Sequence, residues 1–169
     1  MGRLKNQILA RLFTKFPFLV ERWVEKAAPW KVEGIPWAPV TKPVKDCKIA
    51  IVTTAGVHLK SQKPFDMHDP HGDPTYREIP KDTSKEELII THDYYDHKDA
   101  DKDINVVFPI DRLKELKETG EIKDIAEINF GLMGHIDGGH IYTLINETAP
   151  KIAEKLRQQG VDAVLLTPG

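Results

Sequence analysis

Short apolar runs alternate with amphipathic helical patterns from residue 49 to the end of the chain. The runs span residues 49–54, 88–91, 128–134 and 161–167, lengths typical of buried strands. Residues 106–109 form a shorter apolar piece that could be an edge strand. This alternation predicts an α/β layered domain with a mainly parallel, doubly wound sheet of the Rossmann or flavodoxin type.

Two helices are expected between these runs. Asp111 is a plausible N-cap for a helix that ends at Gly120. Thr148 together with Pro150 favours the start of a second helix, and Gly160 favours its end. The second helix leads directly into the last apolar run, so the chain is expected to close with an αβ unit.

The first 28 residues predict a helical arm. Apolar side chains recur at helical spacing over residues 3–27, and Pro17 predicts a kink or two short helices. Six cations against two carboxylates make the stretch basic. It could lie on a membrane surface or dock on a partner, but packing on its own domain or on a second subunit is the favoured interpretation.

Residues 29–46 are rich in proline and contain Trp30 and Trp37, which indicates an extended linker whose aromatic rings need a surface to cover. The organisation predicted is therefore an arm over residues 1–28, a linker over 29–46 and an α/β domain over 47–169. A covering helix normally follows a strand such as 161–167, so we expect the domain to be truncated at its C-terminus.

Composition narrows the possible functions. The chain has 169 residues, enough for one domain with a substantial core, and a formal net charge of −2, which gives no sign of nucleic-acid binding. Cys47 is the single cysteine, which excludes a disulfide framework within these residues and a site of several thiolates. No run approaches the roughly 20 apolar residues of a membrane span, and no signal peptide is recognisable, so a cytoplasmic protein is predicted.

Polar, glycine-rich or histidine-rich sequence follows each of the four predicted strands. In a parallel sheet these loops would meet at the carboxyl edge, which is where doubly wound domains bind ligands. The histidines expected there are candidates for acid–base catalysis: they are His58, His92, His97 and His135. Residues expected to contact substrate in the same loops are Thr54, Gly56 and Thr167.

Residues 55–87 form a long, proline-containing connection, and connections of that length often serve as lids or binding surfaces. Arg77 could clamp a substrate carboxylate with its planar guanidinium, and Glu78 could hold a substrate amine. A solvent-exposed ion pair is the alternative for either residue.

The segment that follows residues 88–91 resembles the zinc-binding run of metallo-β-lactamase-like hydrolases, with Tyr94 in place of a histidine. A metal-dependent hydrolase using His92, Asp96 and His97 is therefore one alternative. Lys98 and Asp99 replace the glycine pair usual after that run, and such a hydrolase needs a longer chain, so no metal site is predicted.

A longer series of motifs gives a more specific resemblance. The motifs are Ala-Ile-Val-Thr-Thr-Ala-Gly-Val-His-Leu-Lys at 50–60, Tyr-Arg-Glu-Ile-Pro at 76–80, Asp-Ile-Asn at 103–105, Phe-Pro-Ile-Asp-Arg-Leu at 108–113, Met-Gly at 133–134 and Gly-Val-Asp-Ala-Val-Leu-Leu at 160–166. From about Trp37 to its last residue the chain resembles the selenoprotein B family. That family includes protein B of the glycine, sarcosine and betaine reductases and the selenoprotein subunit of D-proline reductase.

The resemblance implies a selenocysteine directly after the Thr-x-Gly at residues 167–169, with a cysteine a few residues further on. It therefore implies that the sequence was ended at the selenocysteine codon, and that the chain without its nucleophile is inactive. The implied function is a component of a selenol-dependent reductase that reductively removes the amine from, or opens, an amino acid or a betaine. A pyruvoyl-bearing partner subunit and a thioredoxin-type electron donor are implied as partners.

Two further expectations accompany this assignment. We expect the protein to be an oligomer. A non-catalytic binding or assembly domain of the same complex stays open as the alternative, which is what the chain would be if Gly169 were its natural end. The resemblance does not show which residues of this chain act as acid or base.

Overall fold

The structure is a computed structural model, and it describes residues 2–16, 18 and 38–169. Strand β1 (Lys48–Thr53) runs through the middle of a five-stranded sheet. Strand β7 (Ala163–Thr167) pairs with β1 in parallel along residues 49–53. Strands β5 (Asp124–Ile125) and β6 (Ile128–Leu132) also pair with β1 in parallel, β5 with its first residues and β6 with its last. A strand has two edges, so β5 and β6 share the edge opposite β7.

Strand β3 (Tyr76–Pro80) closes the sheet on the far side of β6 and runs antiparallel to it. An antiparallel edge strand on an otherwise parallel sheet is common in α/β folds. The α/β class and the mainly parallel sheet are therefore confirmed.

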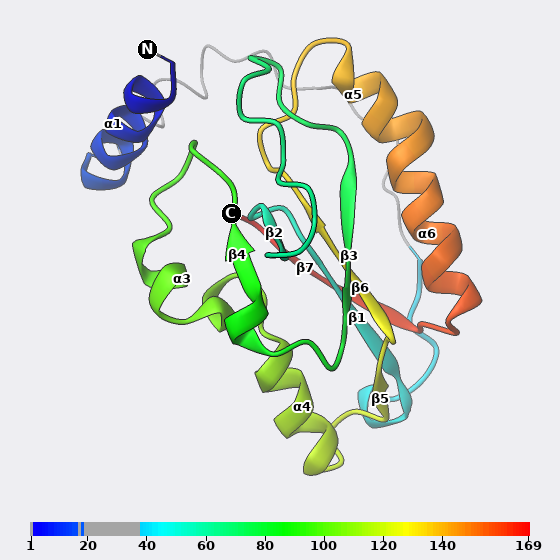
Figure 1. Ribbon diagram of the computed structural model, residues 1–169. Coiled ribbons are helices and arrows are strands. Elements are labelled where there is room, and N and C mark those ends of the chain that lie inside the picture. The colour runs from blue at the N-terminus through cyan, green and yellow to red at the C-terminus, as the bar shows by residue number, and fades with distance from the viewer. Residues whose placement is uncertain (1, 17, 19–37) are drawn as a thin grey trace.

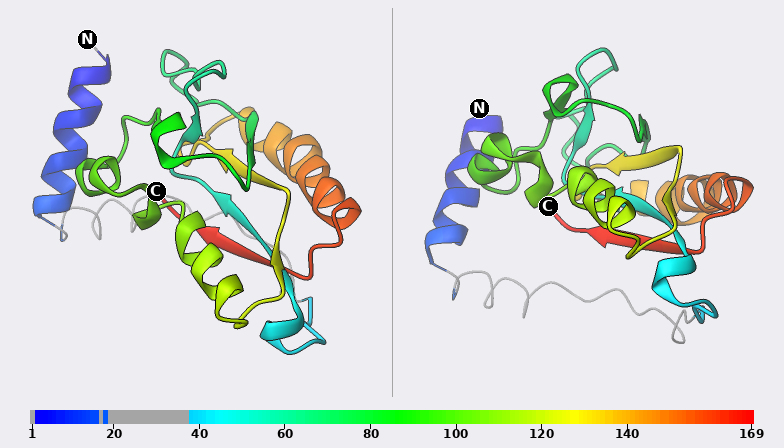
Figure 2. Two further views of the ribbon diagram at one scale, coloured as in Figure 1. Left: turned by 60° about the horizontal axis from the view of Figure 1, so that its bottom comes forward. Right: turned by 90° about the horizontal axis from the view of Figure 1, so that it is seen from below.

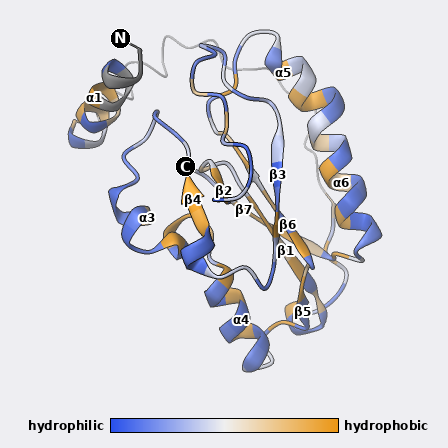
Figure 3. Ribbon diagram, in the orientation of Figure 1, coloured by the Kyte–Doolittle hydropathy of each residue, from blue (hydrophilic) through white to orange (hydrophobic). Residues whose placement is uncertain are grey.

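Helices cover both faces of the sheet (Figures 1 and 2). On one face, α6 (Ala149–Gln158) buries Ile152 and Leu156 against Ala50 and Phe130. On the other face, α4 (Ile110–Glu118) contributes to a second cluster that contains the next strand residue, Ile51. Successive residues of a strand point to opposite faces, which is why a continuously apolar β1 supplies both clusters. Figure 3 shows mostly apolar residues along β1, β4 and β6, hydrophilic residues along β3, and alternating apolar and hydrophilic residues along α4 and α6.

The run at residues 88–91 does not join the main sheet, and that prediction was wrong. Strand β4 (Leu88–Ile90) pairs antiparallel with β2 (Val57–Leu59) in a separate two-stranded sheet. A short apolar run carries no information about its partner strand. The side chain of Ile89 is 43% exposed, which a strand in the centre of the sheet would not allow.

Several helix boundaries also differ from the prediction. Residues 106–109 form no strand, since a 3₁₀ turn (Ile104–Val106) leads into α4 there. Asp111 lies inside the first turn of α4, where its backbone amide donates to the side chain of Asn105. Helix α5 (His140–Thr143) begins well before Thr148 and continues through a π-helical turn (Leu144–Thr148) into α6. The start of α6 at Ala149, after Thr148 and with Pro150 in its first turn, agrees with the prediction, although Thr148 makes no capping hydrogen bond and its hydroxyl instead donates to the Pro74 carbonyl oxygen.

Shorter elements complete the fold. Helix α3 (Lys98–Lys102) follows β4, and 3₁₀ turns lie at Val44–Asp46 and Lys85–Glu87. Helix α1 (Gly2–Lys15) agrees with the first part of the expected arm. The predicted break at Pro17 and most of the expected linker, up to Trp37, lie outside the described residues, so the three-part division of the chain stays a prediction. No helix in the described part of the chain has both the length and the apolar character required to cross a bilayer.

Candidate functional site

Three strand ends meet at the carboxyl edge of the main sheet. The Thr54 amide donates to the Thr167 carbonyl oxygen at 2.9 Å, which joins the ends of β1 and β7. Past β6, a Cβ atom on Gly134 would lie 3.0 Å from the Thr54 carbonyl oxygen and 3.5 Å from that of Gly169. A Cβ on Gly169 would lie only 2.3 Å from the Ala55 Cα atom. Glycine at both positions therefore permits a backbone approach that no other residue would allow without displacement.

His92 joins the loop after β4 to these strand ends. Its Nε2 atom lies 3.2 Å from the Gly134 amide nitrogen, and its Nδ1 atom 3.1 Å from that of Tyr94. A neutral imidazole has one acceptor nitrogen, so only one of the two contacts is a hydrogen bond at a time. The residue is 4% exposed, and burial, followed by the neighbouring His135 and His97, lowers its pKa to about 4. His92 is thus a neutral positioning group at pH 7.

Aromatic rings form the wall beside His92. The Tyr95 ring lies 4.9 Å from the His92 ring, and its hydroxyl donates to the Ala55 carbonyl oxygen at 3.1 Å. Burial raises the pKa of the Tyr95 hydroxyl, so it remains protonated. Tyr94 stacks on His135 at 3.8 Å with an interplanar angle of 19°. This stack connects the loop after β4 to the loop after β6. The loop after β4 therefore reaches the carboxyl edge of the main sheet, as expected, although β4 itself belongs to another sheet.

The four candidate histidines are not all brought together. His135 reaches the aromatic wall, and His97 lies at its rim, where its Nδ1 atom is 2.9 Å from both carboxylate oxygens of Asp101. His58 instead lies on β2, with its ring nitrogens 2.8 Å from the Leu59 carbonyl oxygen and the Thr91 hydroxyl. Burial lowers the pKa of His58. The structure therefore places His92, His135 and His97 around one edge and gives His58 a role in joining β2 to β4.

The expected substrate contacts in the loops also have structural partners. Gly56 adopts a φ of 74°, and a Cβ there would lie 2.5 Å from the Thr91 carbonyl oxygen. The Thr167 hydroxyl donates to the Val107 carbonyl oxygen at 2.7 Å. Thr54, by contrast, lines an apolar cavity of about 420 Å³ between β7 and α6. Roles for these three residues in substrate binding stay predictions.

Arg77 and Glu78 lie on β3, and neither reaches the carboxyl edge through any contact of the described residues. The Arg77 guanidinium packs on the Phe65 ring at 4.3 Å and donates to the carbonyl oxygens of Lys63 and Pro64. The Glu78 carboxylate lies 3.0 Å from the Lys155 ammonium. The Arg77 charge is compensated by the Asp73 carboxylate at 3.5 Å and the Glu78 charge by Lys155, and their proposed contacts with substrate stay predictions.

The residues of the hydrolase-like run do not form a metal centre. Within the described ranges, no group of three histidine, cysteine or carboxylate side chains is arranged to hold a metal ion. The Asp96 carboxylate pairs with the Lys98 ammonium at 3.2 Å, while His97 faces Asp101. The metal-dependent hydrolase therefore finds no support in the geometry.

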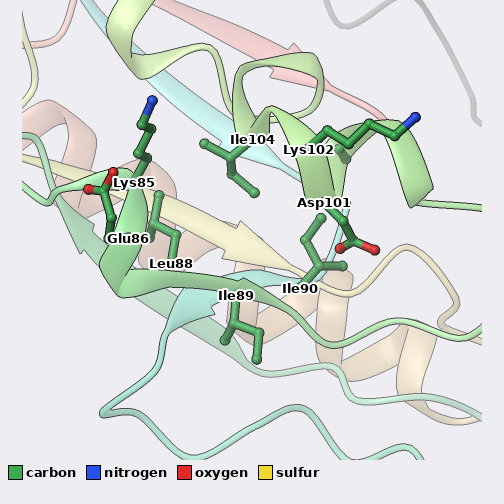
Figure 4. A pocket seen from close by; sticks show the side chains of 9 residues that line it. Lys85, Glu86, Leu88, Ile89, Ile90, Asp101, Lys102 and Ile104 are labelled. Carbon is green, nitrogen blue, oxygen red and sulfur yellow. The ribbon is translucent and has the colours of Figure 1, made fainter.

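Two hollows flank α3. The smaller, of about 170 Å³, adjoins the aromatic wall and is lined by Arg11, His92, Tyr95, Asp96, His97, Lys98 and Asp101. The larger, of about 380 Å³, lies between β4 and the segment around α3. Its floor is formed by Leu88, Ile90 and Ile104, while Lys85 and Lys102 extend outward (Figure 4). It has no contact with the strand ends, and its ionisable groups face solvent.

Sequence patterns alone did not reveal two parts of this site. Tyr94 and Tyr95 were visible only as departures from a metal-binding run, although two aromatic residues after a histidine also indicate a ring-lined loop. Arg11 lies in a helix far away in sequence, and no local signal connects it to residues 92–101.

Comparison with known proteins identifies the family. Residues 21–169 match the family described as glycine/sarcosine/betaine reductase selenoprotein B. The chain belongs to this family. It is 47% identical over 133 residues to the D-proline reductase subunit gamma of Acetoanaerobium sticklandii, covering 79% of this chain and 53% of that protein.

More distant relatives are component B gamma subunits of glycine reductase complexes. The protein of Carboxydothermus hydrogenoformans is 26% identical over 144 residues, and that of Symbiobacterium thermophilum 27% over 148 residues. In both cases the match covers 80% of this chain and 31% of the relative. The chain thus spans about half the length of its D-proline reductase relative and about a third of the length of the other two relatives. No solved structure matches it significantly.

Proposed function

We propose that this selenoprotein B family member is a component of a selenol-dependent reductase that reductively removes the amine from, or opens, an amino acid or a betaine. Two observations support the proposal. The relatives carry the names D-proline reductase and glycine reductase complex. The ends of β1, β6 and β7 converge with the His92 loop at one edge, which is the usual position of an active site in such a sheet.

The nucleophile of this proposal is a selenocysteine that follows Gly169 in the whole subunit. When present, its selenol supplies the group that displaces the amine from the substrate α-carbon, and a thioredoxin-type donor supplies the two electrons. Because the Gly169 backbone lies against Ala55 and near Gly134, the next residue would emerge among the loops described above.

In this proposal the described residues position the loops around the reacting centre and protonate the departing amine. Neutral His92 holds the loop after β4 to the Gly134 amide and presents no charge to the reacting centre. Tyr95 fixes the Ala55 carbonyl next to Gly169. His97 and His135 are only partly buried, so protons from solvent reach both. We propose these two as the candidates for protonating the departing amine.

Partners and location remain part of the proposal. A pyruvoyl-bearing subunit would hold primary or secondary amines, because the side chains of the described residues include no ketone or aldehyde that could condense with an amine. We also propose an oligomeric, cytoplasmic protein.

The test is a reductase assay on the whole subunit with its partner subunits and a dithiol. Glycine, sarcosine, betaine and D-proline are supplied one at a time, and consumption of each is followed. The proposal expects one of the four to be consumed in a dithiol-dependent manner. Consumption of none by an assembled complex would contradict it and favour the non-catalytic assembly role.

A further inference from the structure

The 170 Å³ pocket beside the aromatic wall combines both signs of charge in a small volume. Helix α1 contributes Arg11, and residues 92–101 contribute the other lining groups. Helix α1 runs alongside the segment that carries α3 in both views of Figure 2. Pockets for drug-sized ligands measure roughly 300–1,000 Å³. A hollow of this smaller size suits a ligand of few atoms.

Among the described residues, the charges of the pocket leave one cation, Arg11, without a partner. The Asp96 carboxylate pairs with Lys98 at 3.2 Å, and the Asp101 carboxylate lies 2.9 Å from His97. Arg11 is exposed, and it makes no ion pair or hydrogen bond with any residue in the described part of the chain. A planar guanidinium without a partner matches the two oxygens of a carboxylate.

The pocket also lies next to the strand ends. Tyr95 lines it and donates to the Ala55 carbonyl oxygen, and a Cβ on Gly169 would touch Ala55. His92 lines it and contacts the Gly134 amide through the same ring. The pocket is therefore connected to the end of β7 through Tyr95 and Ala55 on one side and through His92 and Gly134 on the other.

We propose that this pocket binds the small zwitterionic substrate and that Arg11 recognises its carboxylate. The inference rests on the proposed function for the identity of the ligand. In this arrangement Arg11 holds the carboxylate, the rings of His92 and Tyr95 lie beside the ligand, and the amine stays available to the pyruvoyl-bearing subunit of the proposed function. Helix α1 is then part of the binding site, which gives the N-terminal arm a role in specificity.

The experiment measures binding by the whole subunit, using ligand-observed NMR and calorimetry. The probes are glycine, D-proline and betaine, and the control ligands are glycinamide and prolinamide, which lack the carboxylate. The variants are Arg11→Ala and Arg11→Lys, and the matched control is Lys5→Ala. Lys5 is an exposed cation of the same helix that does not line the pocket.

Arg11→Ala should weaken binding of the preferred amino acid roughly tenfold to hundredfold, the usual loss for a hydrogen-bonded ion pair. Arg11→Lys should give an intermediate loss, because lysine keeps the charge but not the planar fork. Lys5→Ala should bind as the wild type does, and the amides should be insensitive to Arg11. Circular dichroism checks that each variant remains folded.

Equal affinity of Arg11→Ala and wild type, an equal loss in Lys5→Ala, or no binding of any probe by the wild type would overturn the inference. The proposed function fails separately. Binding that depends on Arg11 without reductase activity in the assembled complex would contradict the proposed function alone, whereas activity with a KM unchanged by Arg11→Ala would contradict only the pocket assignment.

Discussion

Asn129 connects the fold to the geometry of the site, and replacing it should be costly. Its side chain is fully buried, its Oδ1 atom accepts from the Ile51 amide at 2.8 Å, and its Nδ2 atom donates to the Ala126 carbonyl oxygen at 3.3 Å. At this place β1 changes partner, because residues 48–49 pair with β5 and residues 52–53 with β6. The asparagine amide replaces the strand hydrogen bonds that are missing at the change.

The magnitude follows from the groups left unpaired. Asn129→Ala removes both contacts and leaves a buried amide and a buried carbonyl, each worth about 1–3 kcal/mol when unsatisfied. Water entering the small space left behind would reduce that loss, so we expect a fall of about 2–4 kcal/mol in the free energy of unfolding. For a chain of this size that corresponds to a melting temperature lower by roughly 5–15 °C.

Urea unfolding followed by circular dichroism measures this change. The matched control is Asn146→Ala, since the Asn146 amide donates to a backbone carbonyl on the surface and water can replace it. The control should change the free energy of unfolding by less than about 0.5 kcal/mol. A loss below about 1 kcal/mol in Asn129→Ala, or equal losses in both variants, would refute the reasoning.

Two further predictions concern ionisable groups. The folded-state pKa of His92, about 4, lies below the ordinary 6.5, so the unfolded chain binds the proton more readily and stability falls as pH drops from about 6.5 towards 4. Between pH 6.5 and 4, the free energy of unfolding of the His92→Gln variant should fall by up to about 3 kcal/mol less than that of the wild type, as measured by urea titrations at several pH values. Parallel pH profiles of the two proteins would show that His92 is not buried in its neutral form. Arg77→Lys should lower the free energy of unfolding by about 1–2 kcal/mol, because the single lysine nitrogen cannot take the positions of both arginine nitrogens that donate to the Lys63 and Pro64 carbonyl oxygens, nor lie flat on the Phe65 ring. Arg112→Lys, on the exposed face of α4, should leave the urea midpoint unchanged, and an equal shift in both arginine variants would count against this assignment.

Local patterns were sufficient for the parts of the fold that depend on local physics. The continuous apolar runs around β1, β6 and β7 were recognisable because strands buried on both faces need no alternation. The end of α6 was recognisable at Gly160, which has a φ of 69°. The convergence of polar loops followed from the parallel sheet.

The errors involve choices that only tertiary contacts decide. The pairing of β4 with β2, and not with the main sheet, depends on a turn at Gly56 and on contacts some 30 residues apart. The early start of α5 depends on a π-helical turn whose Thr148 is held by the Pro74 carbonyl oxygen. The separation of His58 from the other histidines follows from the same strand pairing, and Arg11 reaches the pocket only through the packing of α1.

Gly134 offers the most direct test of the claim that the carboxyl edge is the reductase site. Its φ lies outside the left-handed region, so alanine is compatible with the backbone there. The added methyl group would lie 3.0 Å from the Thr54 carbonyl oxygen, 3.3 Å from the His92 Nε2 atom and 3.5 Å from the Gly169 carbonyl oxygen. It therefore presses on the Thr54 carbonyl and the His92 ring by a few tenths of an ångström and makes an ordinary van der Waals contact with Gly169. Gly139→Ala is the matched control, because nothing lies within 4 Å of a Cβ at Gly139.

The measurement is kcat/KM for dithiol-dependent reduction of the preferred substrate by the whole subunit with its partners. Small misplacements of reacting groups cost up to about a hundredfold in rate. We expect Gly134→Ala to lose about tenfold or more in kcat/KM while its melting temperature stays close to that of the wild type, and Gly139→Ala to be fully active. Full activity in a folded Gly134→Ala variant, or equal losses in the two variants, would contradict the placement of the reductase site at this edge.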